Sequence, residues 1–312
     1  MIATYVHSID PVIAKLGPFY LWWYGLSYTL GFLGVFFWMK RQRMAPGEVY
    51  DLVLRLGTGV LLGGRLVEVF FYEWAYYGEH LWHIPAVWLG GMSTHGILLG
   101  GTLGALWHCR RTGRNFLDFA DLFVVVGAYI MGVGRIGNFI DGQIVGPVTS
   151  MPWGVKFPDV EGFRHPVVLY DGIKNLLLVP ILIWIRRSNP PRGAVLGSFL
   201  FGYGFFRFFI DLLREYRTDL FDLPPGQWFN LIMSVLGVAL IWWGYRKGVR
   251  APAAVAPVIK GGLRGRRIAL AVLLFVPILI PSDWTQDVPE RYGARHPGMT
   301  HSRIYPPVES DG

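Results

Sequence analysis

The chain has 312 residues, of which 53% are hydrophobic and 16% are charged, whereas soluble domains carry about 25% charged residues. This composition excludes an ordinary soluble domain and predicts a polytopic, all-α membrane protein. The net charge of +8 does not indicate nucleic-acid binding, because the basic residues stand in short clusters between apolar segments. The single cysteine, Cys109, excludes a disulfide framework and a cysteine-rich metal site.

Seven segments are apolar and long enough to cross a bilayer as helices, since roughly 20 residues span the hydrocarbon core. In chain order they are Pro18–Trp38, Leu52–Tyr72, Ser93–His108, Phe116–Ile136, Val167–Ile185, Ala194–Leu213 and Gln227–Tyr245. A candidate eighth span, Ile268–Ile280, is shorter and contains Pro277. We therefore expect one transmembrane domain over residues 1–250, a basic linker at 251–267, an extra helix at 268–281 and a polar, poorly ordered tail at 282–312.

Basic residues cluster after every second span. The loops that follow the first, third, fifth and seventh spans begin with Lys40, Arg110, Arg186 and Arg246, each beside further basic residues. Because such loops stay on the cytoplasmic side, the N-terminus is predicted to lie outside. The turn-rich loop at 141–166 then forms an extracytoplasmic cap, and the basic linker at 251–267 is cytoplasmic.

The run Gly134–Gly146 carries an arginine and an asparagine to the outer end of the fourth span. A charge at a membrane edge is costly, so Arg135 is a candidate functional residue. Asn138 lies one helical turn further on and can hydrogen-bond whatever Arg135 holds. The glycines of the run, among them Gly142 and Gly146, permit close approach of a ligand headgroup.

Four polar residues lie on one face of the sixth span: Tyr203, Arg207, Asp211 and Arg214. A polar stripe on an otherwise apolar helix must face protein or a wet cavity. It is either an internal Arg207–Asp211 ion pair, with Arg214 reaching for the interface, or an anion site. The excess of arginine over acid favours the anion site, and guanidinium groups from two helices suit a phosphate.

Other polar residues lie near the outer ends of spans. His95 begins the third span among glycines, and its imidazole can accept a proton near neutral pH. No second ligand stands at metal-binding spacing from it, so no metal site is expected. Tyr24 belongs to the aromatic belt or faces inward as a hydrogen-bond donor. Arg65 and Glu68 predict a structural ion pair in the second span.

Together these residues resemble the prolipoprotein diacylglyceryl transferase family of bacterial inner membranes. The resemblance covers about residues 12–245, and the Gly-Arg-x-Gly-Asn-Phe-Ile run is the family's signature. The matching segments are Trp23-Tyr24-Gly25, Gly63-Gly64-Arg65, Gly90 to Gly96, Gly134 to Gly146, Arg164-His165-Pro166, Leu169-Tyr170, Tyr203 to Phe208 and Gly226-Gln227. The resemblance implies a multi-pass protein of the inner membrane with seven spans, an outer N-terminus and a site that opens toward the outer leaflet.

The resemblance also implies a reaction. The diacylglyceryl group of phosphatidylglycerol would pass to the lipobox cysteine thiol of a prolipoprotein, forming a thioether and releasing glycerol phosphate without a cofactor. Arg135 and Arg207 would hold the phosphate, while His95 and Tyr24 would lie close to the reacting centre. The implied substrate-binding set is Arg135, Asn138, Gly142, Gln143, Gly146, Tyr203, Asp211 and Arg214.

The chain departs from the family pattern at three places. Asp141-Gly142-Gln143 stands where Asn-Gly-Glu is usual, and Asp171 and Asp211 stand where glutamate is usual. The segment after the seventh span has no family counterpart. Two alternatives to the transferase remain: a divergent paralogue that transports an anionic lipid, and one that serves as a lipid-binding scaffold. Transport is disfavoured because the chain has no inverted repeat.

Overall fold

The computed structural model describes residues 5–142, 144–158, 160–213, 225–250, 262–282, 292–293, 295–300 and 304–305. Its contacts divide the chain into two compact units. Unit 1 contains residues 1–10 and 113–256, and unit 2 contains residues 11–112 and 257–312. The C-terminal segment therefore belongs with the first helices of the chain and not with the helices that directly precede it.

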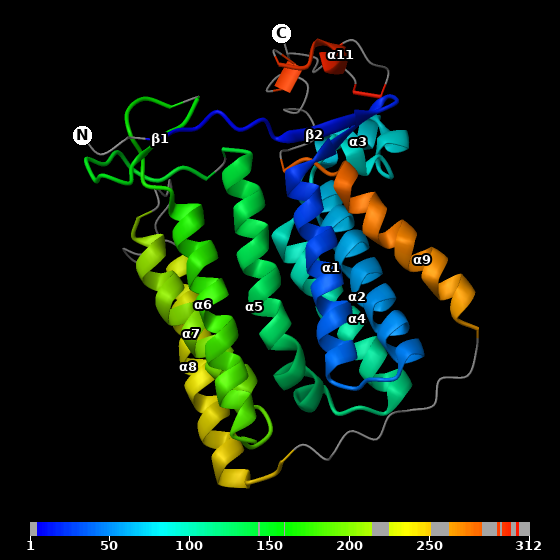
Figure 1. Ribbon diagram of the computed structural model, residues 1–312, viewed down its shortest axis with the longest axis vertical. Coiled ribbons are helices and arrows are strands. Elements are labelled where there is room, and N and C mark those ends of the chain that lie inside the picture. Colours follow the sequence, from blue (N-terminus) through cyan, green and yellow to red (C-terminus); the bar gives the residue numbers. More distant parts are fainter. Residues whose placement is uncertain are drawn as a thin grey trace. The chain divides into compact units, whose positions relative to one another are not determined.

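Unit 1 is a group of four long helices: α5 (Phe116–Ile140), α6 (Val167–Arg187), α7 (Ala194–Asp211) and α8 (Pro225–Lys247). In Figure 1, α6 lies between α5 and α7, and α7 packs along α8. All four helices are long and apolar enough to cross a membrane. Two short parallel strands, β1 (Tyr5–Val6) and β4 (Val155–Lys156), tie the start of the chain to the loop after α5.

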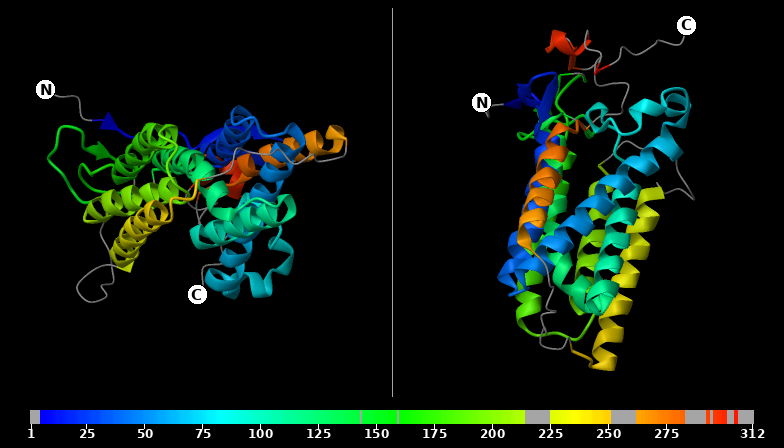
Figure 2. Two further views of the ribbon diagram at one scale, coloured as in Figure 1. Left: turned by 90° about the horizontal axis from the view of Figure 1, so that it is seen from below. Right: turned by 90° about the vertical axis from the view of Figure 1, so that its right-hand side faces the viewer.

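Unit 2 contains α1 (Trp23–Arg41), α2 (Pro46–Val67), α4 (Thr94–Thr112) and α9 (Leu263–Phe275). The antiparallel strands β2 (Val12–Leu16) and β3 (Phe19–Trp22) lead into α1. Short elements fill the connections: the π-helix η1 (Glu68–Tyr72), α3 (Trp74–Glu79), the 3₁₀ turns η2 (Leu81–His83), η3 (Val87–Leu89) and η4 (Val276–Leu279), and α11 (Pro297–Thr300). Figure 2 shows α9 beside α1 and α2 from two further directions.

Glycines let α2 and α4 pack backbone against backbone. A Cβ on Gly59 or Gly63 would overlap the carbonyl oxygens of Gly100 and Gly96 on the facing helix. This small-xxx-small spacing is a common way for helices to associate in lipid, where van der Waals contact replaces the hydrophobic effect. It brings the end of α2 close to the start of α4, where His95 lies.

Helix α5 has defined signals at both ends. The side chain of Asn115 accepts hydrogen bonds from the backbone N–H groups of Leu117 and Asp118, which satisfies donors of the first turn. At the other end Gly142 has a φ of +70°, a conformation that glycine adopts without strain and that ends many helices. Helix α5 therefore continues to Ile140, four residues past the predicted end, and Arg135 lies within its last turns.

The prediction of a mainly helical membrane protein is confirmed, with local corrections. Among the described residues seven helices have 18 residues or more, one for each predicted span, and four of them are both long and apolar enough to cross a membrane. The first helix begins at Trp23, not at Pro18, because residues 19–22 pair with β2 and bury Tyr20 and Trp22. The strands were not predicted.

The described residues of the tail pack against unit 2. Tyr292, Met299 and Tyr305 are buried in one cluster with Trp22 and Leu89. The apolar residues of the tail pack against the apolar and aromatic side chains that β3 and η3 of unit 2 present. The tail has 8 charged residues among its 31, and its generally polar composition hides this tendency in the sequence.

Candidate active site

Five ionised side chains from three helices form one cluster in unit 1. Asp171 on α6 is at its centre and is 1% exposed. One of its carboxylate oxygens is 2.6 Å from Arg135 Nε on α5 and 2.6 Å from Arg207 Nη1 on α7. The other oxygen is 2.7 Å from Lys174 Nζ, and Arg207 Nη2 is 2.9 Å from Asp211 Oδ1. We call these residues the cationic cluster.

The helices bring these side chains together for simple geometric reasons. Arg207 and Asp211 are four residues apart on α7, and Asp171 and Lys174 are three apart on α6, so each pair shares one helix face. Helix α6 approaches α5 at Gly172, where a Cβ would come within 3.1 Å of the Arg135 Cβ. A larger residue there would push Arg135 away from Asp171.

The cluster carries one more positive than negative charge. Arg135, Lys174 and Arg207 are balanced by the carboxylates of Asp171 and Asp211. Buried charges are tolerated only when they are paired and hydrogen-bonded, because desolvation of each ion costs several kcal/mol. The unmatched positive charge therefore favours an anion beside Arg135, whose side chain is the most exposed of the five at 26%.

Neutral groups orient the charged ones. Asn138 accepts a hydrogen bond from Arg135 Nη1 at 3.2 Å, and Asn230 Nδ2 on α8 donates to Asp211 at 2.8 Å. The Lys174 ammonium lies 3.8 Å from the centroid of the Tyr203 ring, a favourable cation–π position. Tyr203 thus lies beside the cluster.

Two cavities border the cationic cluster. A small one of about 10 Å³ is lined by Arg135, Ile144, Val167, Val168 and Arg207, and it has room for about one water molecule. A larger one of about 400 Å³ runs along α6 and α7 and is apolar except at one end. Its lining is Tyr170, Ile173, Lys174, Leu177, Leu178, Ile181 and Phe206. An acyl chain suits this cavity, which meets the cationic cluster at Lys174.

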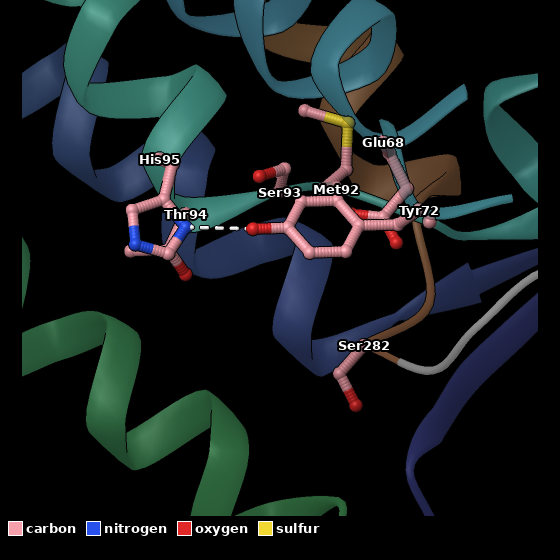
Figure 3. A pocket seen from close by; sticks show the side chains of 8 residues that line it. Glu68, Tyr72, Met92, Ser93, Thr94, His95 and Ser282 are labelled. Atoms are coloured by element: carbon pink, nitrogen blue, oxygen red, sulfur yellow. Dashed lines mark hydrogen bonds between the residues drawn. The ribbon is translucent and has the colours of Figure 1, made fainter. Parts of the chain in front are cut away.

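A second candidate site lies in unit 2 around His95 (Figure 3). A cavity of about 230 Å³ is lined by Glu68, Tyr72, Gly91, Met92, Ser93, Thr94, His95 and Ser282. His95 is exposed, and its Nδ1 is 3.0 Å from the Tyr72 hydroxyl. Tyr72 is in the π-helix η1, an irregularity that often marks a functional site. We call this the His95 pocket.

The structure gives contacts for two further predicted residues of unit 2. Tyr24 pairs its hydroxyl with that of Tyr28 at 2.9 Å and is not among the described residues that line the His95 pocket, and its place near the reacting centre stays a prediction. Arg65 donates to carbonyl oxygens of the loop before α4, including those of Ile84 at 2.8 Å and Ala86 at 3.1 Å. It thereby holds that loop, in place of the ion pair with Glu68 that the spacing predicts.

The remaining predicted residues follow α5 in unit 1 or fall outside the described structure. Gly142 closes α5 beside His7 and Phe157. The N–H of Gly146 donates to the His165 carbonyl at 3.0 Å, and a Cβ there would meet that oxygen at 2.7 Å. Gln143 and Arg214 lie outside the described residues.

Sequence reasoning missed Lys174 and left Asp171 outside the candidate set. Both stand in an apolar segment, and ionisable residues within a membrane span are functional candidates by default. Their spacing of three residues was a usable signal, since it places acid and base on one helix face. Asn230 in α8 gave a weaker signal, because a single amide in a span often bonds within its own helix.

Comparison with known proteins identifies close relatives. The family model described as prolipoprotein diacylglyceryl transferase matches residues 11–243. A phosphatidylglycerol–prolipoprotein diacylglyceryl transferase of Nitrosomonas europaea is 40% identical over 253 residues, 77% of this chain and 91% of the relative. An enzyme of the same description from Vibrio atlanticus is 37% identical over 253 residues, 77% of this chain and 93% of the relative.

Proposed function

Because the chain belongs to the prolipoprotein diacylglyceryl transferase family, we propose that it transfers the diacylglyceryl group of phosphatidylglycerol to the lipobox cysteine of a prolipoprotein. The observation that carries this proposal is the cationic cluster, whose unmatched positive charge adjoins an apolar cavity of about 400 Å³. A phospholipid has the matching chemistry, a phosphate joined to acyl chains. Neither the family match nor the geometry favours a transporter or a scaffold.

In the reaction the acceptor sulfur forms a bond to the glycerol carbon of the donor, and the bond from that carbon to the phosphate oxygen breaks. The electron pair leaves with glycerol phosphate. Arg135 and Arg207 hold the phosphate and stabilise the charge that develops on its leaving oxygen. Asn138 and Tyr203 support them, and Asp171 keeps both guanidinium groups in place.

The acceptor thiol must lose its proton. A free thiol has a pKa of about 8.5, so forming the thiolate at pH 7 costs about 2 kcal/mol. We assign His95 as the base, because its imidazole is exposed in the His95 pocket and the Tyr72 hydroxyl orients it. Tyr24 then has a supporting role at most, since it hydrogen-bonds Tyr28.

We also propose that α1, α2, α4, α5, α6, α7 and α8 each cross the bacterial inner membrane, with the N-terminus and the site on the outer side. The basic residues at the ends of α1, α4, α6 and α8 support this orientation. Helix α9 adds an eighth crossing. These assignments make the protein an integral enzyme that meets donor and acceptor at the outer leaflet.

The test is transfer of diacylglyceryl to a lipobox peptide by purified variants. Arg135→Ala and Arg207→Ala should lower the rate by roughly hundredfold or more, because each leaves Asp171 and the phosphate short of a charged partner. Arg192→Ala is the matched control, since Arg192 pairs with Asp118 in the same unit and not with the cluster. Near-normal transfer by either cluster variant contradicts the phosphate assignment.

His95→Gln tests the base. A general base contributes about 10²- to 10⁴-fold, so the variant should lose at least that lower factor while its KM for phosphatidylglycerol stays near that of the parent. A rate within a factor of about two of the parent removes His95 from this role.

A further inference from the structure

The segment beyond the family match is built into unit 2. The match ends at residue 243, and α9 begins at Leu263. At the start of α9, Arg266 Nε donates to Asp51 Oδ1 of α2 at 2.6 Å. About two turns further along α9, Leu273 packs into the space that Gly57 of α2 leaves open. A Cβ on Gly57 would come within 2.5 Å of Leu273 Cδ2. Helix α9 therefore packs along α2 from Asp51 to Gly57.

The end of α9 reaches the start of α1. Thr29 Oγ1 donates to the carbonyl oxygen of Leu274 at 2.6 Å. Gly25 lies against the backbone of η4, and a Cβ there would overlap the Pro277 carbonyl. Asp51 stands near the start of α2 and Gly25 near the start of α1, so α9 and η4 run from one end of these antiparallel helices to the other.

The described tail covers the same end of unit 2. The Tyr292 ring packs edge-on against Trp22 at 5.0 Å between centroids. The Tyr305 hydroxyl accepts a hydrogen bond from the backbone N–H of Tyr20 at 3.4 Å, and Trp88 Nε1 donates to the Ile304 carbonyl at 3.1 Å. The tail is thus anchored at both β3 and η3.

Between α9 and the tail, the chain passes the His95 pocket. Ser282 follows the buried Ile280 and lines the pocket together with Tyr72 and His95 (Figure 3). Its hydroxyl oxygen is buried and makes no hydrogen bond within the described structure. Because this oxygen is out of reach of solvent, Ser282 bounds the pocket through the rest of the residue.

The size of the His95 pocket restricts what it can hold. Its volume of about 230 Å³ is below the roughly 300–1,000 Å³ of pockets that enclose a whole small ligand. It therefore takes one or two small side chains of an extended peptide and leaves the rest outside. Among the described residues, Ser282 is the one that the C-terminal segment contributes to the pocket wall, so the width of this pocket depends on a part of the chain outside the family match.

We propose that Ser282, held by α9 and the tail, is a specificity-determining residue for the acceptor peptide. This inference rests on the proposed function, because it takes the lipobox peptide as the molecule that enters the His95 pocket. Ser282 limits the size of the side chain next to the acceptor cysteine. It takes no part in the chemical step and does not contact the donor.

The experiment measures diacylglyceryl transfer to synthetic lipobox peptides that differ in the size of the residue beside the cysteine. Ser282→Trp should raise the KM for acceptor peptides by about tenfold or more, with the largest increase for the bulkiest neighbour. The KM for phosphatidylglycerol should stay within twofold of the parent. Ser282→Ala should improve transfer to bulky peptides relative to small ones. Val272→Trp, on the exposed face of α9, is the matched control and should match the parent.

The outcomes separate this inference from the proposed function. A parent protein that modifies none of the peptides overturns the function and the inference together. An active parent with an unchanged acceptor KM in Ser282→Trp overturns the inference alone, and so does a parallel rise in the KM for the donor. If Ser282→Trp does not accumulate in the membrane, Ser282→Leu is measured in the same way and judged by the same criteria.

Discussion

Asp171 balances the charge of the cationic cluster at the scale of a single residue. Its two oxygens contact Arg135, Arg207 and Lys174, so its loss leaves three cations with the single carboxylate of Asp211. Asp171→Asn keeps the shape and removes the charge. Breaking a buried ion pair costs about 3–5 kcal/mol, so we expect a marked fall in thermal stability and a loss of transfer activity. Thermal unfolding and peptide modification measure the two effects.

Asp118→Asn is the matched control for that prediction. Asp118 contacts Arg192 through both oxygens, at 2.6 and 2.8 Å, but the two side chains are 17% and 21% exposed. Because both of these side chains keep some contact with solvent, whereas Asp171 has almost none, loss of this pair should cost less stability than loss of Asp171 and should leave transfer intact. Equal losses of thermal stability and transfer activity in Asp171→Asn and Asp118→Asn would contradict the central role of Asp171 in the cationic cluster.

The sequence predicts contacts within a helix far better than contacts between helices. The Arg207–Asp211 pair follows from a spacing of four residues, and the structure confirms it. The contact of Arg135 with Asp171 spans 36 positions, and no local pattern reports which helices meet. Arg65 illustrates the same limit, because its carbonyl partners belong to a loop whose path depends on the tertiary fold.

The glycine contact between α2 and α4 determines how closely these two helices approach each other. A Cβ on Gly100 would overlap the Gly59 carbonyl, whereas a Cβ on its neighbour Gly101 would meet only the Val60 side chain at 3.4 Å. Gly100→Ala should therefore destabilise the protein by about 1–3 kcal/mol. Gly101→Ala should be neutral or slightly stabilising, because alanine favours a helix. Thermal unfolding of the two variants in detergent compares them, and similar melting temperatures would contradict the close contact.

The loop before α4 should respond to acid through His83. Burial, then the neighbouring His80 and Arg65, lower the pKa of His83 from its ordinary value. Its Nδ1 is 2.9 Å from the Tyr76 hydroxyl, and its carbonyl accepts from Arg65. A depressed pKa means that the folded loop prefers the neutral ring. The stability that the neutral His83 ring gives the folded loop is present above about pH 6.5, the pKa of histidine in the unfolded chain. It is lost as the pH falls through the lower pKa of His83 in the folded loop.

Hydrogen exchange of residues 80–91 at pH 7.5 and pH 5 measures that response. After correction for intrinsic rates, exchange should be faster at pH 5 in the parent. In His83→Gln the difference between the two pH values should shrink, because glutamine does not titrate. The backbone of α1 serves as an internal reference. A parent loop with the same protection at both pH values would contradict the prediction.

The helices themselves could be predicted with ends at most about six residues away from those observed, because apolar runs of membrane length leave little choice of structure. The boundaries failed where local interactions compete with the apolar pattern. Residues 19–22 are apolar enough to continue α1, but Gly17, with a φ of +58°, turns the chain and lets them pair with β2. Helix α5 runs on to Ile140 because its glycines do not break a helix that is held by neighbouring packing.

At the scale of the whole molecule, the C-terminal segment makes unit 2 discontinuous in sequence. Residues 257–312 join residues 11–112, and unit 1 takes almost all of the chain between them. Composition does not reveal that the C-terminal segment packs against the first helices of the chain, because α9 is short and the tail is polar. The anchors are single contacts, such as Arg266 with Asp51 and Leu273 with Gly57, and their partners lie more than two hundred positions away.

Thiol labelling tests whether α9 crosses the membrane. The parent has one cysteine, Cys109, which is 4% exposed, and Cys109→Ala supplies a background without thiols. In that background Arg295→Cys, on the exposed part of the described tail beyond α9, should react with a membrane-impermeant maleimide from outside intact cells. Arg264→Cys, at the other end of α9, should react only after the membrane is opened. The difference follows because α9 and η4 run from the start of α2 to the start of α1.

Two further cysteines calibrate that experiment. Trp82→Cys, in the exposed loop before α4, marks the outer side, and Arg43→Cys, between α1 and α2, marks the inner side. If Arg264→Cys and Arg295→Cys both react like Trp82→Cys, α9 lies on the outer surface and the chain has no eighth crossing. Opposite labelling of the two ends would make the segment beyond the family match a membrane-spanning part of unit 2, with Ser282 delivered to the outer side by α9.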